Sequence, residues 1–195
     1  MAGIYIHIPF CKKLCFYCDF YHVISAADSS AFREALMKEI SLRKDYLESE
    51  TISTIYFGGG TPSVFLVEEI AAILEEIRNN FIVEDNCEIT IEINPDDVSS
   101  SYLAGLKDLN INRISLGIQS WRDDDLKMMN RRHTAAQAEN ALRDVFAAGF
   151  ENVTVDLIYG IPGMRAKDWE ANLDFTFSFG IKHLSAYHLT IERMG

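Results

Sequence analysis

Residues 5–20 read YIHIPFCKKLCFYCDF, a short apolar strand followed at once by three of the chain's four cysteines. The spacing C-x3-C-x2-C lets three thiolates surround one compact metal group. A 4Fe-4S cluster needs four ligands, so three cysteines leave one iron open to another molecule. We therefore interpret Cys11, Cys15 and Cys18 as metal ligands, and the open position indicates chemistry beyond a structural role.

Other readings of these cysteines remain open but fit less well. Cys15 and Cys18 alone would suit a thioredoxin-like redox site or half of a zinc site. A structural zinc ion needs a fourth ligand at motif spacing, and His7 and His22 are poorly spaced for that role. A disulfide fits worst, because nothing resembling a signal peptide precedes the first strand. We expect a reducing, cytoplasmic setting.

At these cysteines the chain resembles the radical S-adenosylmethionine (SAM) superfamily, in which SAM binds the fourth iron of the cluster through its amino and carboxylate groups. The longer pattern from Tyr5 to Cys11 resembles one branch, which holds oxygen-independent coproporphyrinogen III oxidase and the HemW heme chaperones. The resemblance runs through all 195 residues. It implies a radical SAM core domain over residues 1–195, with the family's C-terminal domain absent from this chain.

Composition predicts one soluble domain of 195 residues, with 48% hydrophobic and 24% charged residues. No apolar run approaches the roughly 20 residues of a membrane helix, so an integral membrane protein is not expected. The net charge of -11 argues against a nucleic-acid partner, because that binding is driven by Lys and Arg.

The chain alternates β-branched runs with amphipathic stretches, which predicts a parallel sheet. We expect strands at residues 4–7, 53–57, 88–94, 113–118, 153–158 and 183–189. We expect helices at residues 30–47, 67–79, 101–109, 135–148 and 167–177.

Side chains alternate between polar and apolar along the third, fourth and fifth of these strands. The polar face carries Glu88, Thr90, Glu92, Asn94, Arg113, Ser115, Gly117, Gln119, Asn152, Thr154 and Asp156. Right-handed crossovers place the helices on the apolar face, so the polar face should line an interior that holds a ligand. A polar lining and six strands favour an α/β fold with an incomplete (β/α)6 barrel, the three-quarter barrel that the resemblance also implies. A flavodoxin-like open sheet is the alternative.

The second predicted strand ends in a glycine-rich turn, Gly58-Gly59-Gly60-Thr61-Pro62. Glycines let a ligand touch bare backbone, although a plain turn into a helix would also explain them. A phosphate loop is excluded, because no Gly-Lys-Ser/Thr follows. The turn matches the superfamily's GGGTP stretch, whose backbone holds the amino group of SAM. We therefore predict Gly59, Gly60 and Thr61 as SAM contacts.

Glu92, Gln119 and Asp156 lie toward the carboxyl ends of consecutive predicted strands, on the polar face. Polar groups paired within a core would explain each of them separately. The resemblance implies instead that these three, with Tyr5 and Arg131, contact SAM. For the arginine the register is open by one residue, because Arg132 follows it directly.

His7 shares a strand face with Tyr5 and is a weak catalytic candidate, about as well explained by a structural hydrogen bond. We interpret Cys87 as a lone buried thiol. We interpret the acidic run 123–125 as the solvated start of a helix. The remaining histidines are left without a role: His22, His133, His183 and His188.

The resemblance implies that a reduced cluster cleaves SAM to a 5'-deoxyadenosyl radical, with electrons from a donor such as a flavodoxin or ferredoxin. Two functions compete, a heme chaperone that passes heme to other proteins and an oxidase that decarboxylates porphyrinogen propionates. The oxidase pattern continues to Cys-x-Cys, whereas Phe20 stands here, and the oxidase's long segment before the first strand is missing. Both differences favour the chaperone, whose heme motif lies in the absent C-terminal domain. An inactive fragment is the third hypothesis.

Overall fold

The computed structural model describes residues 2–24 and 29–190. Its sheet has six parallel strands in the order β1-β2-β3-β4-β5-β6. The strands are β1 (Ala2–Ile8), β2 (Ile52–Gly59), β3 (Val83–Ile93), β4 (Arg113–Gln119), β5 (Asn152–Tyr159) and β6 (His183–His188). The helices are α1 (Ser29–Leu42), α2 (Val67–Asn80), α3 (Ser100–Asp108), α4 (Asp123–Met128), α5 (Ala135–Ala147) and α6 (Ala166–Ser178). Two 3-10 turns, η1 (Pro62–Val64) and η2 (Pro95–Asp97), follow β2 and β3.

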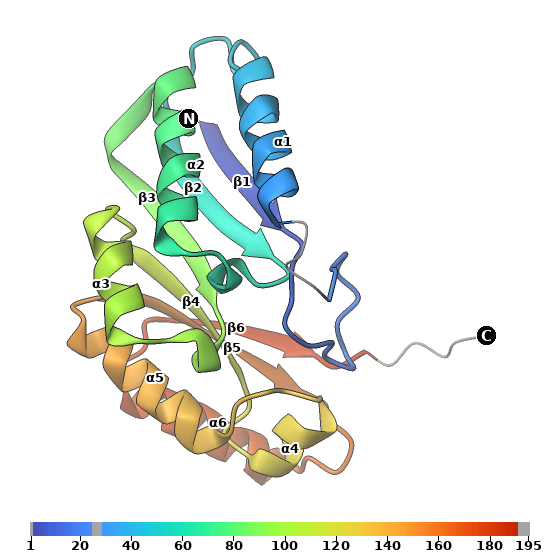
Figure 1. Cartoon of the computed structure of the whole chain (residues 1–195). Helices are drawn as coiled ribbons and strands as arrows, with labels where there is room; N and C mark the ends of the chain where they lie inside the picture. Colours follow the sequence, from blue (N-terminus) through green and yellow to red (C-terminus); the bar gives the residue numbers. More distant parts are fainter. Residues whose placement is uncertain (1, 25–28, 191–195) are drawn as a thin grey trace.

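The sheet curls, and the helices cover its convex outer face (Figure 1). The strands run in strict chain order, whereas a flavodoxin-like sheet changes direction after its first strand. The incomplete (β/α)6 barrel predicted from the strand and helix alternation is therefore confirmed, and the open-sheet alternative is wrong.

The apolar face of the sheet packs against the helices, as the alternation predicts. In β3, Ile89, Ile91 and Ile93 are buried in the same cluster as the apolar stripe of α2. That stripe follows helical spacing, at Ile70, Ile73, Leu74 and Ile77. Each such side chain contributes about 1.5–3 kcal/mol by leaving water, so the outer layer supplies most of the burial that holds the barrel.

The inner face of the barrel is polar, and at the amino ends of the strands its side chains bond to one another. Arg113 donates to Glu88 at 2.8 Å and to Thr154 at 3.0 Å. Thr154 in turn bonds His183 Nδ1 at 3.1 Å. We call these four residues the amino-end network. It lies at the end of the interior opposite the carboxyl ends of the strands, where a cavity forms.

Several boundaries differ from those predicted. α1 ends at Leu42 instead of residue 47, because residues 43–49 continue as turns. β3 begins at Val83, five residues before the predicted start, because Val83 pairs with Ile52 across a register shift that pattern alone does not reveal. The acidic run does begin a helix, α4, but Asp125 is buried and accepts a hydrogen bond from Ser120 Oγ at 2.8 Å. The prediction that residues 123–125 are a solvated helix start is therefore wrong for Asp125.

Within residues 2–24 and 29–190, none of the helices has the length and apolar character needed to cross a membrane.

Candidate functional site

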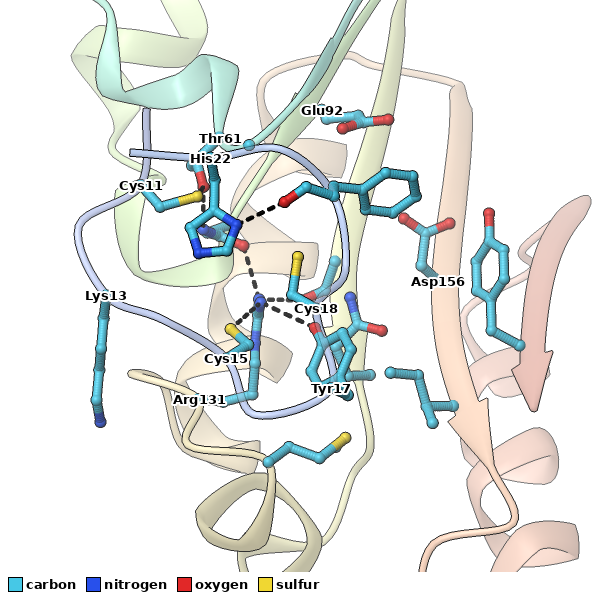
Figure 2. Close-up of a pocket in the computed structure, with 18 of the residues that line it drawn as sticks. Cys11, Lys13, Cys15, Tyr17, Cys18, His22, Thr61, Glu92, Arg131 and Asp156 are labelled. Carbon is cyan, nitrogen blue, oxygen red and sulfur yellow. Dashed lines mark hydrogen bonds between the residues drawn. The ribbon is translucent and has the colours of Figure 1, made fainter. Parts of the chain in front are cut away.

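A cavity of about 940 Å³ opens at the carboxyl ends of the strands, beneath the loop that follows β1 (Figure 2). Its walls come from that loop, from the β2 turn and from the inner face of β3, β4 and β5. Every residue predicted to bind metal or SAM lies on them: Tyr5, Cys11, Cys15, Cys18, Gly59, Gly60, Thr61, Glu92, Gln119, Arg131 and Asp156. The structure thus brings these side chains together, while their roles as ligands remain predictions.

The cysteine loop is tied to the turn after α4. Phe16 N donates to the carbonyl oxygen of Met129 at 3.2 Å, and Asn130 Nδ2 donates to that of Leu14 at 2.6 Å. Asn130 itself has a φ of 60°, a left-handed conformation that Asn tolerates better than most residues. These bonds hold the middle of the loop over the cavity.

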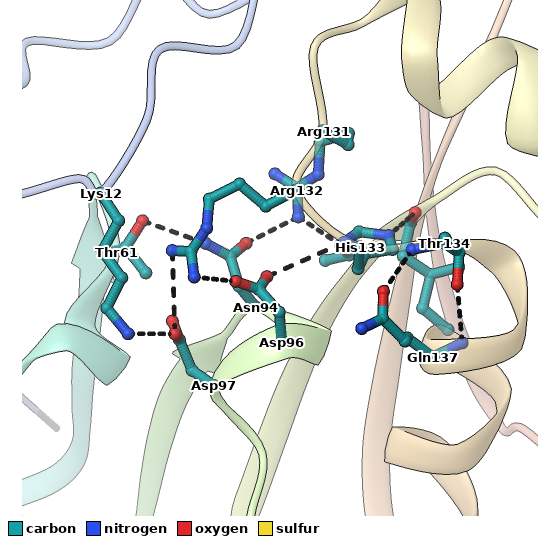
Figure 3. Close-up of polar contacts among 12 residues, drawn as sticks. Lys12, Thr61, Asn94, Asp96, Asp97, Arg131, Arg132, His133, Thr134 and Gln137 are labelled. Carbon is teal, nitrogen blue, oxygen red and sulfur yellow. Dashed lines mark hydrogen bonds and ion pairs between the residues drawn. The ribbon is translucent and has the colours of Figure 1, made fainter.

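A second anchor lies between the first two cysteines. Lys12 Nζ pairs with Asp97 Oδ1 at 2.5 Å, and the Asp97 side chain is only 2% exposed. Asp97 also accepts a hydrogen bond from Ser63 Oγ at 2.8 Å. The carboxylate therefore joins the cysteine loop to η1 and η2, as Figure 3 shows for Lys12.

The three cysteine thiols converge on the cavity without meeting at one point. Burial, together with the charge of the neighbouring thiols, raises the pKa of Cys11 and of Cys18. In the described part of the chain, no three His, Cys, Asp or Glu side chains lie close enough to hold a single metal ion. A 4Fe-4S cluster takes one thiolate per iron, so its ligands surround a cage. Three cysteine thiols are a donor set that fits such a cluster.

Arg131 extends from the turn after α4 to the cysteines, as Figure 2 shows. Its Nη1 lies 3.6 Å from Cys15 Sγ and 3.3 Å from the Tyr17 hydroxyl. Its Nη2 donates to Asn94 Oδ1 at 2.6 Å and to the carbonyl oxygen of Gly117 at 2.8 Å. The Nε atom is buried with no hydrogen-bond partner among the described residues. The guanidinium is therefore held through its two terminal nitrogens, Nη1 and Nη2.

Arg132 points elsewhere and forms ion pairs with Asp96 and, at 4.0 Å, Asp97 (Figure 3). Of the two adjacent arginines, Arg131 is the one that faces the cysteines.

Two carboxylates lie on the opposite wall. Glu92 accepts hydrogen bonds from the Tyr56 hydroxyl at 2.9 Å and from Gly59 N at 3.3 Å. Burial raises the pKa of Glu92 to about 7, and the charge of Asp156 adds to the rise. Burial also raises the pKa of Asp156, which accepts a hydrogen bond from Ser115 at 3.2 Å. Neither carboxylate forms an ion pair within the described residues, so this wall suits a cationic ligand.

The glycines of the β2 turn pack against β1 and the residues that follow it. A Cβ on Gly59, whose φ is +113°, would lie 2.6 Å from the His7 ring. A Cβ on Gly60 would lie 2.9 Å from backbone atoms of Pro9 and Phe10. The amide of Gly60 donates to the carbonyl oxygen of Ile8 at 2.9 Å, so this donor is already used. Close approach to the exit of β1 thus accounts for Gly60 without any ligand.

His7 is not among the residues that line the cavity. Its Nε2 bonds the carbonyl oxygen of Tyr21 at 3.1 Å, and its Nδ1 bonds the Tyr5 hydroxyl at 3.2 Å. A carbonyl only accepts, so in the neutral ring Nε2 carries the proton and Nδ1 accepts from Tyr5. This geometry suits a residue that orients Tyr5, which is 58% exposed at the cavity mouth.

Gln119 ends β4 with a φ of +69°. Such a conformation costs a non-glycine residue on the order of 1–3 kcal/mol and is often found at functional sites. The strained residue lines the cavity.

Three residues of the site were missed as candidates: Tyr17 and Asn94 line the cavity, and Tyr56 donates a hydrogen bond to Glu92. Asn94 carried a signal, because it lies on the predicted polar face beside Glu92. Cys87 is buried and free, outside the cavity, as predicted. His133, left without a role, is buried and bonds the carbonyl oxygen of Ile118 at 3.0 Å.

Comparison with known proteins gives a consistent result. The radical SAM superfamily model matches residues 5–176. The chain is 36% identical over 189 residues to the heme chaperone HemW of Lactococcus lactis, covering 96% of this chain and 49% of that protein. It is also 36% identical over 196 residues to the HemW of Haemophilus influenzae, covering 97% and 51%. The chain spans about half the length of the curated relatives it matches.

Among solved structures, coproporphyrinogen III oxidase (HemN) of Escherichia coli, a radical SAM enzyme, superimposes with a TM-score of 0.87. The two are 27% identical, over 96% of this chain and 44% of that one.

Proposed function

The chain belongs to the radical SAM superfamily, and on that premise we propose that Cys11, Cys15 and Cys18 hold a 4Fe-4S cluster with SAM at the open iron. The observation that carries the proposal is the convergence of these three thiols on one cavity that also contains the unpaired carboxylates. When bound, the cluster and SAM supply the radical chemistry. The protein supplies ligands, orientation and exclusion of water.

The cavity walls have complementary charges for SAM, which is both a cation and an amino acid. Glu92 and Asp156 favour its positive sulfonium and ammonium groups. Arg131, a cation on the cavity wall, favours its carboxylate. The proposed SAM contacts include four further residues of the cavity wall: Tyr5, Gly59, Thr61 and Gln119. Gly60 is kept as a cavity-wall residue whose first role is to let β2 approach the cysteine loop.

For the whole protein we propose heme binding and transfer, as the name of the HemW relatives describes for them. Phe20 supports this choice over the oxidase, because it stands two residues after Cys18, where the oxidase carries a further cysteine, and it is 69% exposed. An electron donor such as a flavodoxin or ferredoxin and heme-accepting proteins are the partners this function requires.

A porphyrinogen oxidase is the second candidate, and the close superposition with HemN supports it. In that case the same cavity and cluster would serve hydrogen abstraction from propionate side chains, and the protein would be an enzyme in the ordinary sense.

The first test is anaerobic reconstitution with iron and sulfide, followed by metal analysis and titration with SAM. We expect about four irons and four sulfides per chain, and SAM binding that depends on them. Cys15→Ser should lose the cluster. The matched control is Cys87→Ser, a buried cysteine outside the cavity, which should keep it. One zinc ion and no labile sulfide would contradict the proposal.

The second test separates the two functions. The complete product of the gene is incubated anaerobically with reductant, SAM and coproporphyrinogen III, and a second sample is titrated with heme. The HemW of Lactococcus lactis and HemN of Escherichia coli serve as references. We expect saturable heme binding and no decarboxylated product. Turnover comparable with that of HemN would assign the chain to the oxidases.

A further inference from the structure

A continuous chain of side-chain hydrogen bonds links two of the three cysteines through a residue to which no role has been given. Cys11 Sγ lies 3.4 Å from Thr61 Oγ1, and Thr61 Oγ1 lies 3.2 Å from Asn94 Nδ2. Asn94 Oδ1 lies 2.6 Å from Arg131 Nη2, and Arg131 Nη1 lies 3.6 Å from Cys15 Sγ. Figure 3 shows Asn94 between Thr61 and Arg131.

The direction of each bond in this chain follows from chemistry. A guanidinium only donates, so the atom of Asn94 that faces Arg131 must be its oxygen. The amide nitrogen of Asn94 then faces Thr61 and donates to Oγ1. Because Thr61 accepts from Asn94, its single hydroxyl proton is free to point to Cys11 Sγ. Both ends of the chain therefore direct a donor at a cysteine sulfur.

The surroundings strengthen these bonds. Thr61 is 5% exposed, and the backbone amide of Asn94 is fixed by Ser63 Oγ at 3.3 Å. The Arg131 Nη2 atom that bonds Asn94 also donates to the carbonyl oxygen of Gly117. Hydrogen bonds in such partly dry sites are stronger than in water and polarise one another along a chain. An arrangement with two donors aimed at sulfurs suits thiolates better than neutral thiols.

We propose that Asn94 is a positioning residue that holds the Thr61 hydroxyl and the Arg131 guanidinium on the sulfurs of Cys11 and Cys15, and so raises the reduction potential of the cluster. This inference rests on the proposed function, since it requires a cluster on these thiolates. Reduction adds one electron, supplied by an external reductant, to a cluster already bound by three anionic sulfurs. Donors on those sulfurs stabilise the added charge, and hydrogen bonds to sulfur are known to set cluster potentials.

The experiment measures the midpoint potential of the reconstituted cluster by anaerobic titration with dithionite, followed by electron paramagnetic resonance, without SAM. Thr61→Val removes the hydroxyl with little change in volume, and Thr61→Ser keeps it. Asn94→Leu removes the bridge. The control is Thr90→Val, a buried threonine on β3 that lies outside the chain of bonds.

We expect a more negative potential in Thr61→Val, a still more negative one in Asn94→Leu, and the wild-type value in Thr61→Ser and Thr90→Val. Because both changes act on one chain of bonds, adding Thr61→Val to Asn94→Leu should shift the potential by less than Thr61→Val does alone.

The inference is overturned if Asn94→Leu or Thr61→Val holds a full cluster at the wild-type potential, or if Thr61→Ser shifts as far as Thr61→Val. If Asn94→Leu loses the cluster, the Thr61 pair decides alone. A wild-type chain that takes up no iron and sulfide would instead refute the proposed function, so the two failures are distinguishable.

Discussion

The same polar face of the same strands lines both ends of the barrel interior. The two ends differ in whether their charged side chains have partners within the protein. At the amino end, Arg113 lies between Glu88 and Thr154, and its charge is matched within the protein. At the carboxyl end, Glu92 and Asp156 face a cavity of about 940 Å³ and form no ion pair in the described part of the chain.

Because of this difference, one strand contributes to stability at its amino end and to the site at its carboxyl end. In β3, Glu88 belongs to the amino-end network, and Glu92, four residues later, lines the cavity. In parallel barrels the carboxyl ends of the strands carry the site, while the other end supports the fold. Unmatched charge is unfavourable for folding, so its presence at one end only indicates a ligand that completes it.

The largest effect on stability is expected where the carboxyl end is packed against the cysteine loop. Gly60→Ala would place Cβ 2.9 Å from backbone atoms of Pro9 and Phe10, just before Cys11. We expect a loss of about 2–3 kcal/mol in urea unfolding, together with impaired cluster uptake. A substitution at Gly60 should therefore disturb the cysteine loop, and not SAM binding alone.

The control for this change is Gly149→Ala. Its φ of +82° adds backbone strain, but a Cβ there meets nothing within 4 Å. We expect a loss of about 1 kcal/mol and normal cluster uptake. Equal losses in the two variants would mean that close packing at Gly60 has no special role.

The amino-end network is tested by Arg113→Leu. The change leaves Glu88 without its partner, and Arg113 is 22% and Glu88 40% exposed. We expect a loss of about 2 kcal/mol, below the 3–5 kcal/mol typical of fully buried pairs, with ligand binding unchanged. In the exposed pair between Glu39 of α1 and Arg43, just after this helix, Arg43→Leu should cost about 0.5 kcal/mol or less. Similar losses in both would show that the network contributes no more than a surface pair.

Among the three test variants, apart from their controls, the smallest effect, and one of opposite sign, is expected from Glu92→Gln. The pKa of Glu92 rises from 4.5 to about 7 on folding, so the folded state binds more protons between these values. Its contribution to stability is therefore lost as the pH rises from 4.5 through 7. Removing the charge should stabilise the protein by about 1–2 kcal/mol at pH 8.5 and leave it nearly unchanged at pH 4.5.

The matched comparison is Glu88→Gln at the other end of the same strand. Glu88 is paired with Arg113, so this change should destabilise the protein at pH 8.5. Thermal unfolding of both variants at the two pH values distinguishes the ends. A Glu92→Gln protein that is less stable than wild type at pH 8.5 would remove the contrast between them.

Much of this site could be predicted from local sequence patterns, because the alternation of side chains along a strand repeats every two residues. The period of two in β3, β4 and β5 placed Glu92, Gln119 and Asp156 on one face, and the structure puts all three on the cavity wall. The same period put Asn94 on that face without revealing its partners.

By itself, the sequence determined the order of strands and helices, the polar interior and the position of the cysteine loop after β1, because each depends on neighbours within a few residues. Only the tertiary structure decided that Arg131 and not Arg132 reaches Cys15, across 116 residues of chain, and that Gly60 packs against Pro9. It also decided that Asn94 bridges Thr61 and Arg131. A periodic pattern specifies the face on which a side chain lies, but contacts between distant segments depend on how the curled sheet brings the strand ends and their loops together.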